Sequence, residues 1–504
     1  MNILVIDVGT SSIRGILYRG NGEKVFVKQV KYLPVHGDDG RVEQPASDFE
    51  DALILILQAF TSRIHIFKAE IDAISLTAQR SSVIPLDVSG QPLMDTIMWQ
   101  DTRNREICRL LETYDDEIFR LSGARVNCVF SGGKMMWIRL VRPEIYKDVF
   151  KFVNIPEYLI HLMTGEYVTD HTYGSRSNLM NLRTREWDDR LLELFQVNKE
   201  HLCTLKEPGS VVGHISEDFS RRSGLRVGIP VISAGGDQQC AAIGHGAYKE
   251  GTISIVTGTG AFLVAASRNI PENLSGDIIC NCSSVSEEYI IEANVLTCSS
   301  AFDWYCRTFY DWEKIDYARI NQELEEIYYE ESSCLVLPYF QGRSTPNWNP
   351  EAKAAFLDMS LGTRREEILK AVLEGIFLEI SNNIHIFRKY VYVDSAYISG
   401  GLTNSEIMNY MQADIYGIPL YHLEDTESTS VGALIVALKK LTGKSIDEVF
   451  ADIRRRDAIE KYDFDDERHH VYLEKQKRMN ELYSKLYAHG NSFAVPQDLD
   501  GSVS

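Results

Sequence analysis

The sequence predicts a two-domain protein of the α/β class, and three observations support this. The chain has 504 residues, more than one hydrophobic core usually serves, so we expect a ligand cleft between two domains. Strand-like apolar runs alternate with segments of helical periodicity along most of the chain. A strand, a turn of glycine and threonine, and a second strand occur around Gly9 and again around Gly258.

The N-terminal segment predicts a three-stranded meander followed by a helix and another strand. Apolar runs at 2–7, 12–18 and 24–30 have strand length, and Asn21-Gly22 between the last two favours a hairpin turn. An amphipathic helix is expected over 47–60, with Ser47 and Glu50 forming a capping box at its start. The apolar run at 71–79 is typical of a strand.

The second half repeats this pattern. Residues 253–267 have strand, glycine and threonine turn, and strand again, which indicates either an internal duplication or a combination common in α/β proteins. Helical periodicity dominates 364–391, a strand is expected at 395–401, and a further helix from about Asn404. The polar end, 489–504, lacks apolar anchors and is expected to be frayed.

These elements lead us to divide the chain near Gly244 to Gly251. We expect an N-terminal domain at 1–245. A C-terminal domain is expected at 246–450, and a C-terminal helix and tail at 451–504.

Composition excludes several classes of function. Apolar residues make up 44% of the chain and the formal charge is −20, so the surface should repel nucleic acid and anionic lipid. No apolar run approaches the roughly 18 residues of a membrane span, and Met1 leads directly into a strand, so we expect a cytoplasmic protein. The nine cysteines are scattered, and we expect reduced, mostly buried thiols.

Two glycine turns and two acids suggest phosphate chemistry without a P-loop. No Walker A lysine loop, protein-kinase HRD or HExxH motif occurs, so phosphate would be held by other means. The turns "DVGTSS" at 7–12 and "TGTG" at 257–260 offer backbone N–H groups and hydroxyls, and Asp7 could hold magnesium directly or through water. Asp237, after two glycines, is a candidate base for an attacking hydroxyl.

Each of these features also has a purely structural interpretation. Asp7 could cap a turn, the glycines around Thr259 could form a tight hairpin, and Asp237 could cap the helix that follows it. Each structural interpretation is favoured when its motif is taken alone. Their joint occurrence in this order favours phosphoryl transfer.

Taken together, the motifs resemble the FGGY carbohydrate kinases, which are ATP-dependent sugar and polyol kinases of the actin and hexokinase superfamily. The similarity covers roughly residues 1 to 445. Its pieces are "IDVGTSSIRGILY" at 6–18, "MWQDTR" at 98–103, "FSGGKMMWI" at 130–138, "GGDQQCAAIG" at 235–244, "VTGTGAF" at 256–262 and "SGGLTNSEIMNYMQADIYGIPL" at 399–420. The resemblance implies two ribonuclease-H-like domains with a central cleft. It places the substrate site, the first phosphate turn (7–12) and the catalytic acid in 1–245, and the ATP-binding site in 246–450.

The resemblance also implies roles for individual residues, with ATP and Mg²⁺ as the nucleotide and the metal. Asp237 would be the general base and Asp7 would hold Mg²⁺ directly or through water. The implied nucleotide and phosphate contacts are Gly9, Thr10, Ser11, Arg14, Gly258, Thr259, Gly260, Gly401, Asn404 and Ser405. The implied substrate contacts are Gln79, Arg80, Ser81, Trp99, Asp101, Gln238 and Phe262.

The implied substrate is a small sugar, sugar acid or polyol. Local similarity is greatest to glycerol kinases, but Ser81 stands where those enzymes have glutamate and Val129 where they have tyrosine. Losing two polar partners disfavours glycerol and leaves room for a longer substrate, with a xylulose-like pentulose favoured. Gluconate, which Arg80 could bind, glycerol and an autoinducer-2-type sugar remain alternatives.

Two other classes of function stay open at this point. One is an ATPase of the actin or Hsp70 type, and the other is a catalytically silent sugar sensor. The resemblance to the FGGY kinases also implies a homodimer or a homotetramer, since many of those kinases form such assemblies, and no motif in this chain distinguishes the two states.

Overall fold

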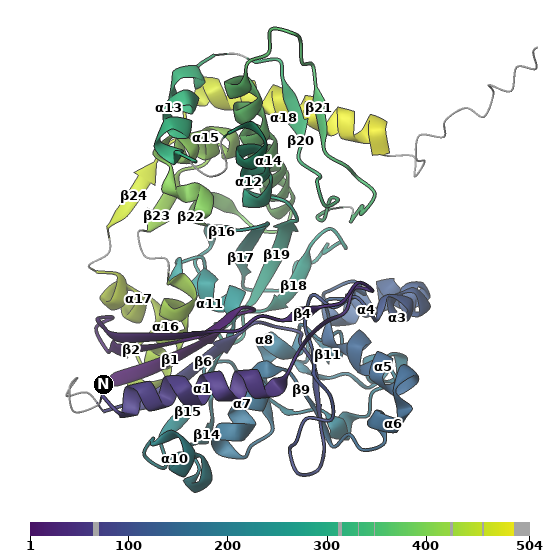
Figure 1. Ribbon diagram of the computed structural model, residues 1–504, viewed down its shortest axis with the longest axis vertical. Helices are drawn as coiled ribbons and strands as arrows, with labels where there is room; N and C mark the ends of the chain where they lie inside the picture. Colours follow the sequence, from purple (N-terminus) through teal and green to yellow (C-terminus); the bar gives the residue numbers. More distant parts are fainter. Residues whose placement is uncertain are drawn as a thin grey trace, which may run out of the picture.

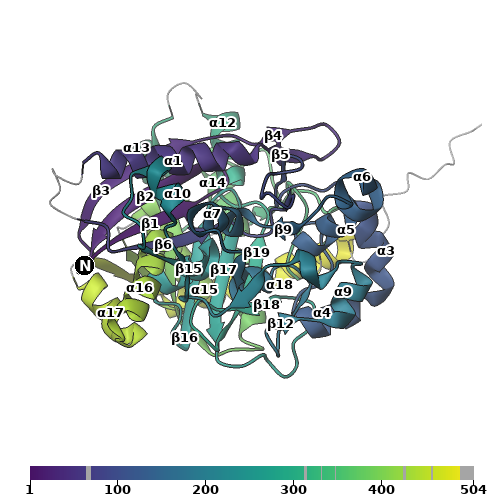
Figure 2. The same cartoon turned by 90° about the horizontal axis from the view of Figure 1, so that it is seen from below.

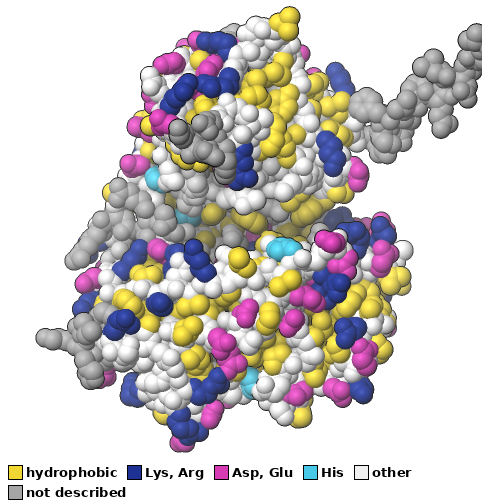
Figure 3. Space-filling view, viewed as in Figure 1, with side chains coloured by type: hydrophobic (Ala, Val, Ile, Leu, Met, Phe, Trp, Pro, Cys, Tyr) yellow, Lys and Arg dark blue, Asp and Glu magenta, His cyan; other side chains and the backbone are white. Residues whose placement is uncertain are grey.

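The computed structural model describes most of the chain as two lobes stacked along the long axis of the molecule (Figure 1). The described residues are 1–63, 70–310, 315–330, 332–346, 348–423, 427–455 and 458–487. The expected frayed end, 489–504, lies outside them. In a space-filling view the surface narrows to a waist between the lobes, and basic and acidic side chains are interspersed on that face (Figure 3).

The first lobe contains a six-stranded sheet in the order β14-β15-β6-β1-β2-β3. β1 is antiparallel to β2 and parallel to β6, which is parallel to β15. The predicted meander is therefore confirmed, as is the strand predicted at 71–79. The strands are β1 (Asn2–Val8), β2 (Ser12–Arg19), β3 (Lys24–Lys31), β6 (Ala73–Ala78), β14 (Val211–His214) and β15 (Pro230–Gly236).

The second lobe contains a seven-stranded sheet in the order β18-β19-β17-β16-β22-β23-β24. β16 is antiparallel to β17 and parallel to β22, so five strands of each sheet share one order and one pairing pattern. This shared topology favours internal duplication over a chance recurrence of the turn. The strands are β16 (Gly251–Thr257), β17 (Ala261–Ser267), β18 (Ile279–Cys282), β19 (Tyr289–Val295), β22 (Val393–Gly400), β23 (Leu420–Leu423) and β24 (Ile459–Tyr462).

Helices cover both sheets. In the first lobe the longest, α1, packs on α7 and α10 below the sheet, and a cluster of short helices forms one side of the lobe (Figures 1 and 2). First-lobe helices are α1 (Ala46–Thr61), α3 (Arg105–Leu111), α4 (Asp115–Ser122), α5 (Ser131–Val141), α6 (Pro143–Tyr146), α7 (Ile155–Thr164), α8 (His171–Gly174), α9 (Asp189–Leu194), α10 (Glu217–Ser223) and α11 (Asp237–Gly244). Later helices are α12 (Ser299–Phe309), α13 (Tyr317–Ile327), α14 (Arg365–Phe387), α15 (Glu406–Tyr416), α16 (Ser428–Thr442), α17 (Ile446–Arg454) and α18 (Asp466–Tyr487).

Short strands complete the two lobes. They are β4 (Val35–His36), β5 (Val42–Gln44), β7 (Ile84–Leu86), β8 (Thr96–Ile97), β9 (Lys151–Val153), β10 (Val168–Asp170), β11 (Met180–Asn181), β12 (Glu186–Trp187), β13 (Thr204–Lys206), β20 (Leu335–Leu337) and β21 (Ala355–Leu357).

The predicted capping box of α1 is wrong. The helix begins one residue earlier than expected, with Pro45 as its N-cap and no side-chain capping bond. Glu50 cannot reach back to the helix start, because its carboxylate accepts from the Tyr158 hydroxyl (3.1 Å) and pairs with Arg222. The helices predicted at 364–391 and after Asn404 are confirmed, the first ending earlier, at Phe387.

Two helices from distant parts of the chain, α11 and α16, cross where the lobes meet. A Cβ at Gly432 would lie 1.8 Å from the Cys240 carbonyl oxygen, and one at Gly244 would lie 2.0 Å from the Ser428 carbonyl oxygen. Only glycine permits such contact between backbones. α16 belongs to the later part of the chain, yet its apolar side chains share a core with β1, β6 and β15 of the first lobe.

We predict that Gly432→Ala destabilises the protein, because the added methyl group would overlap the Cys240 carbonyl. Overpacking of this kind typically costs about 1–3 kcal/mol. Thermal unfolding followed by circular dichroism measures the effect. Gly362→Ala is the matched control, since Gly362 is exposed and its nearest atom would lie at 3.6 Å. Equal melting temperatures for the two variants would contradict the assigned helix contact.

Candidate functional site

A cleft of about 790 Å³ lies between the lobes and is lined by residues of both. It brings together ten of the residues singled out in the sequence, although they span more than half of the chain. These are Thr10, Gln79, Arg80, Trp99, Asp237, Gln238, Gly258, Thr259, Gly260 and Phe262.

Asp237 stands at the junction of β15 and α11. Gly235 precedes it with a φ of +104°, and a Cβ there would lie 2.1 Å from the Ser284 hydroxyl oxygen, so the approach to the acid requires glycine. The N-cap of α11 is Gly236, which rules out the interpretation of Asp237 as the helix cap. Its side chain is 28% exposed and lines the cleft, where a ligand can reach it.

Charges around Asp237 set its protonation. Burial raises the pKa of the Asp237 carboxyl, and the Arg80 guanidinium, with Nε 3.5 Å from Oδ1, opposes this. The carboxylate also accepts from the Gln238 backbone N–H (2.8 Å). The result is a carboxylate with a raised proton affinity, which suits a group that accepts a proton.

Arg80 is already paired with a residue of the opposite lobe. Its Nη1 donates to Oε1 of Glu292 on β19 (2.5 Å), and Arg176 Nη1 lies 3.2 Å from the other oxygen of that carboxylate. Burial opposes ionisation of Glu292, but the two guanidinium groups outweigh it and lower its pKa. Two arginines thus face two acids, Glu292 and Asp237, and the cluster has no formal excess charge.

The first of the two turns expected to contact phosphate, at 7–12, lies at the end of β1. The Gly9 N–H donates to the Ser12 carbonyl (2.9 Å), and the Thr10 hydroxyl accepts from the Trp99 indole N–H (3.1 Å) at the cleft. Arg14 does not lie free beside an anion site, since its Nη1 donates to Glu427 (2.6 Å) at the start of α16. The tertiary structure therefore couples this turn to α16.

Asp7 lies near the end of β1, next to the same turn, and its carboxylate accepts a hydrogen bond from the Ser430 hydroxyl (3.3 Å). Burial and the nearby charge of Asp237 raise its pKa to about 7. A divalent cation would relieve this repulsion, so the side chain fits the proposed magnesium role. In the described part of the chain no group of three or more His, Cys, Asp or Glu could hold a metal.

The second turn expected to contact phosphate, at 257–260, joins β16 to β17. The Thr259 carbonyl accepts from the Cys298 N–H (2.8 Å) and the Ser300 hydroxyl (2.8 Å), which fixes the turn against the start of α12. A Cβ at Gly260 would lie 2.4 Å from the Val295 carbonyl oxygen. Thr259 itself is exposed at the cleft.

The expected nucleotide segment lies beside this turn, outside the cleft lining. Gly401 and Asn404 are exposed in a 3-10 turn after β22, and Ser405 is buried and donates to Asn321 (2.9 Å). A Cβ at Gly401 would lie 3.8 Å from Ser299, whose N–H donates to the Gly258 carbonyl (2.9 Å). The two segments therefore meet at the start of α12.

Two expected substrate contacts do not line the cleft. Asp101 has no exposed surface, because it accepts from the Val42 N–H (2.6 Å) and pairs with Arg103 (2.7 Å). Ser81 is buried at a φ of +71°, and its hydroxyl donates to the Arg176 carbonyl (3.1 Å). Both side chains therefore make contacts inside the protein and do not form part of the cleft wall.

The sequence prediction missed several residues of the cleft. They include Gln100, Asn127, Phe130, Arg176, Glu292, Asn294, Gln341 and Trp348. Glu292 could have been suspected, since a glutamate inside the apolar run 289–293 must find a positive partner. Gln100 and Phe130 lie in the quoted motifs at 98–103 and 130–138, and the others carry no local signal.

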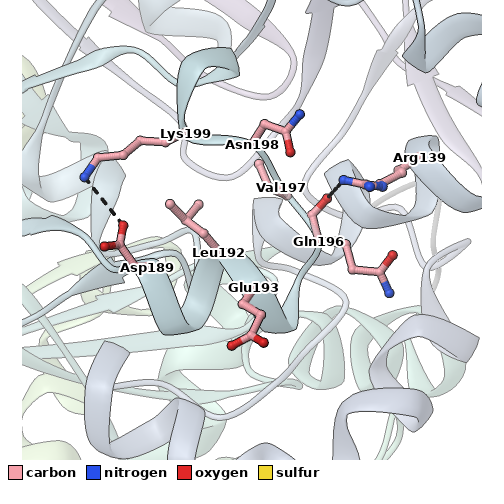
Figure 4. A pocket seen from close by; sticks show the side chains of 8 residues that line it. All are labelled: Arg139, Asp189, Leu192, Glu193, Gln196, Val197, Asn198 and Lys199. Atoms are coloured by element: carbon pink, nitrogen blue, oxygen red, sulfur yellow. Dashed lines mark hydrogen bonds and ion pairs between the residues drawn. The ribbon is translucent and has the colours of Figure 1, made fainter.

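A second, shallower hollow of about 430 Å³ lies on the first lobe beside α9 (Figure 4). Lys199 lies 3.7 Å from Asp189, and Arg139 donates to the Gln196 carbonyl (2.6 Å). Both cations of the hollow therefore already have a partner within the protein. Its lining includes none of the motif residues, and we assign no function to it.

Comparison with known proteins gives family matches over both halves of the chain. The N-terminal domain of the FGGY family of carbohydrate kinases matches residues 2–244, and the C-terminal domain of that family matches 253–441. A glycerol kinase of Mycoplasmoides gallisepticum is 28% identical over 455 residues, which cover 86% of this chain and 88% of that protein. A xylulose kinase of Bacillus subtilis is 25% identical over 500 residues, 97% of each chain.

Solved structures confirm the expected pair of ribonuclease-H-like domains. A xylulose kinase from Brucella ovis superposes with a TM-score of 0.90 at 22% identity, covering 97% of this chain and 100% of that chain. Plasmodium falciparum glycerol kinase with ADP superposes with a TM-score of 0.87 at 24% identity, covering 95% and 98%. Among the helices described, none is long and apolar enough to span a membrane.

The raised pKa of Asp7 predicts a pH-dependent stability change in Asp7→Asn. As pH rises from the ordinary value of 3.8 to about 7, the unfolded chain ionises Asp7 while the folded chain keeps it protonated, so wild-type stability falls. Without added metal, the variant should therefore gain stability over wild type between pH 5 and pH 8, on the order of 2 kcal/mol.

Melting temperatures at pH 5 and pH 8 check this expectation. Asp189→Asn, which changes an exposed carboxylate, serves as the control. A difference between Asp7→Asn and wild type that does not grow with pH would refute the assigned electrostatics.

Proposed function

Since the chain belongs to the FGGY family of carbohydrate kinases, we propose that it transfers the γ-phosphoryl group of ATP to a neutral polyol or ketose. A five-carbon ketose of the xylulose type is the favoured substrate. The observation that carries the proposal is the position of Asp237, whose carboxylate lines a cleft between two glycine and threonine turns from opposite lobes.

In this proposal Asp237 accepts the proton of the attacking hydroxyl as that oxygen bonds to the γ-phosphorus. The bond between the γ-phosphorus and the bridging oxygen breaks, and ADP leaves. Phosphoryl transfer requires mainly positioning and charge neutralisation. Thr10 and Gly9 would contact phosphate from the first lobe, and Thr259 and Gly260 from the second. Mg²⁺, held near Asp7, would neutralise phosphate charge when bound. Because the turns lie on different lobes, closure of the cleft would exclude water from the reacting groups.

The charge balance of the cleft favours a neutral substrate over a sugar acid. The charges around Asp237 already have partners: Arg80 is bound to Glu292 (2.5 Å), and Arg176 contacts the same carboxylate (3.2 Å). A substrate carboxylate would have to displace Glu292 and leave that buried acid unpaired, which is costly. Gluconate is therefore disfavoured, although Arg80 alone suggested it.

The size of the cleft favours a substrate longer than glycerol. Val129 lines the cleft, where a larger side chain would narrow it, and Ser81 is turned away toward the Arg176 carbonyl. Trp99 offers an apolar face for a carbon chain, and Gln79 and Gln238 offer amide groups for hydroxyls. A five-carbon polyhydroxy chain fits this mixture of one aromatic face and several neutral polar groups.

Acceptor-dependent ADP release tests the substrate class. With Mg-ATP, we expect xylulose, ribulose or xylitol to stimulate release more than glycerol, and gluconate to have little effect. Gluconate as the strongest acceptor would overturn the charge argument. ATP hydrolysis that no acceptor stimulates would instead favour an ATPase, and ATP binding without turnover a silent sensor.

Replacing the proposed base gives a separate prediction. Asp237→Asn keeps the shape of the side chain but cannot accept the proton, so turnover should fall about a hundredfold or more. ATP affinity, measured by calorimetry, should change little. Gln238→Ala is a control at the neighbouring position, where we expect a higher KM with a smaller loss of turnover. Near-normal turnover in Asp237→Asn would remove this residue from the base role.

A further inference from the structure

A pair of cysteines lies next to the cleft. Cys108 is on α3 and Cys128 is in the loop 123–130 between α4 and α5, and their sulfur atoms are 3.6 Å apart. Both side chains are partly exposed, whereas the other seven cysteines are buried. These two thiols therefore combine mutual contact with access to small solutes.

The loop that carries Cys128 is also a wall of the cleft. Val126, Asn127, Val129 and Phe130 line the cleft on both sides of Cys128 in the sequence. A movement of the Cys128 backbone would therefore reach the substrate-facing surface directly.

The backbone of this loop is held firmly from the protein interior. The buried Lys134 donates from Nζ to the carbonyl oxygens of Cys128 (2.7 Å) and Val129 (2.6 Å). Asn104, at the start of α3, donates to the Cys128 carbonyl as well (3.3 Å). These bonds tie α3 and the loop together and keep the two sulfur atoms adjacent.

The environment also favours a reactive thiolate. A hydrogen bond from the Cys108 thiol, aided by the positive charges of Lys134 and Arg105, lowers the pKa of Cys128 to about 7. The same contact raises the pKa of Cys108. The pair shares one proton, so Cys128 is the sulfur that attacks and Cys108 the one that resolves.

We propose that Cys108 and Cys128 form a reversible disulfide when the protein meets a hydroperoxide, and that this bond reshapes the substrate side of the cleft. The effect on activity rests on the proposed kinase function. None of the sequence motifs described above contains Cys108 or Cys128, and neither residue lines the cleft.

The chemistry balances with hydrogen peroxide as the oxidant. The Cys128 thiolate attacks one peroxide oxygen, the O–O bond breaks, and the sulfur becomes a sulfenic acid while hydroxide leaves and takes up a proton as water. The Cys108 sulfur then attacks Cys128, the S–O bond breaks, and a second water leaves. Two thiols are oxidised and one peroxide is reduced. A dithiol reductant reverses the reaction by exchange.

Bond formation requires movement. The sulfur atoms must approach from 3.6 Å to about 2.05 Å, and the part of this approach that rotation of the two side chains does not supply must come from the loop or α3. A displacement of about 1 Å near a substrate can cost on the order of a hundredfold in rate. The proposed nucleotide segment at 401–405 lies on the other lobe, so we expect the oxidised protein to lose acceptor use rather than ATP binding.

The decisive experiment maps the disulfide in the full-length protein. Wild type is treated with a small excess of hydrogen peroxide, digested without reduction, and examined by mass spectrometry. We expect a crosslinked peptide that joins Cys108 to Cys128 and disappears on reduction. Absence of this crosslink, or dominant crosslinks between other cysteines, would overturn the proposal. This measurement needs no substrate, so it tests disulfide formation even if the proposed kinase function is wrong.

A second readout tests the effect on the cleft. With the acceptor that stimulates ADP release, kcat/KM of oxidised wild type should fall at least about tenfold and recover on reduction, while the affinity for ATP stays within about twofold. Cys108→Ser and Cys128→Ser should both resist this reversible loss, and either one suffices if the other fails to fold. The matched control, Cys334→Ser, changes a buried cysteine and should remain sensitive. Equal reversible loss in Cys108→Ser would refute the link to the pair.

Discussion

A buried ion pair between Arg80 and Glu292 is the interaction on which the cleft depends. Arg80 follows β6 of the first lobe and Glu292 lies on β19 of the second, so the contact joins the two lobes in the wall of the cleft. A charge that is buried without a partner is costly, and each lobe supplies the partner that the other needs. Arg176 and Asp237 also interact electrostatically with this pair. The same group of charges therefore determines the position of the acid, the net charge of the site and the spacing of the lobes.

The crossing of α11 and α16 links this cluster to the first phosphate turn. Asp237 begins α11, while the start of α16 brings Ser430 to Asp7 and Glu427 to Arg14. Because backbone meets backbone at Gly432, one helix cannot slide without moving the other. The two acids that the proposed chemistry requires are therefore held at a fixed relation by glycine contacts outside the cleft.

Local sequence signals predicted the secondary structure well where the residues of one element, or of one turn, are enough to determine it. The meander of β1 to β3 followed from apolar runs and the Asn21-Gly22 turn, since strand length and turn chemistry act within a few residues. The capping box failed because Glu50 has a stronger partner, Arg222, far along the chain. Asp101 looked like a substrate contact in its motif, but Arg103 and the Val42 N–H occupy its oxygens.

By itself, the sequence determined the α/β class and the recurrence of a strand-turn-strand pattern. It also gave the candidate residues for phosphate chemistry, because glycines, hydroxyls and acids carry that chemistry locally. The tertiary structure alone decided which side chains face the cleft and which charges are already neutralised. Arg80 could be read from its motif as a free cation for a sugar acid, and only the fold shows Glu292 bound to it. The physical reason is that an ion pair depends on distance in space, and these two residues are 212 positions apart in the chain.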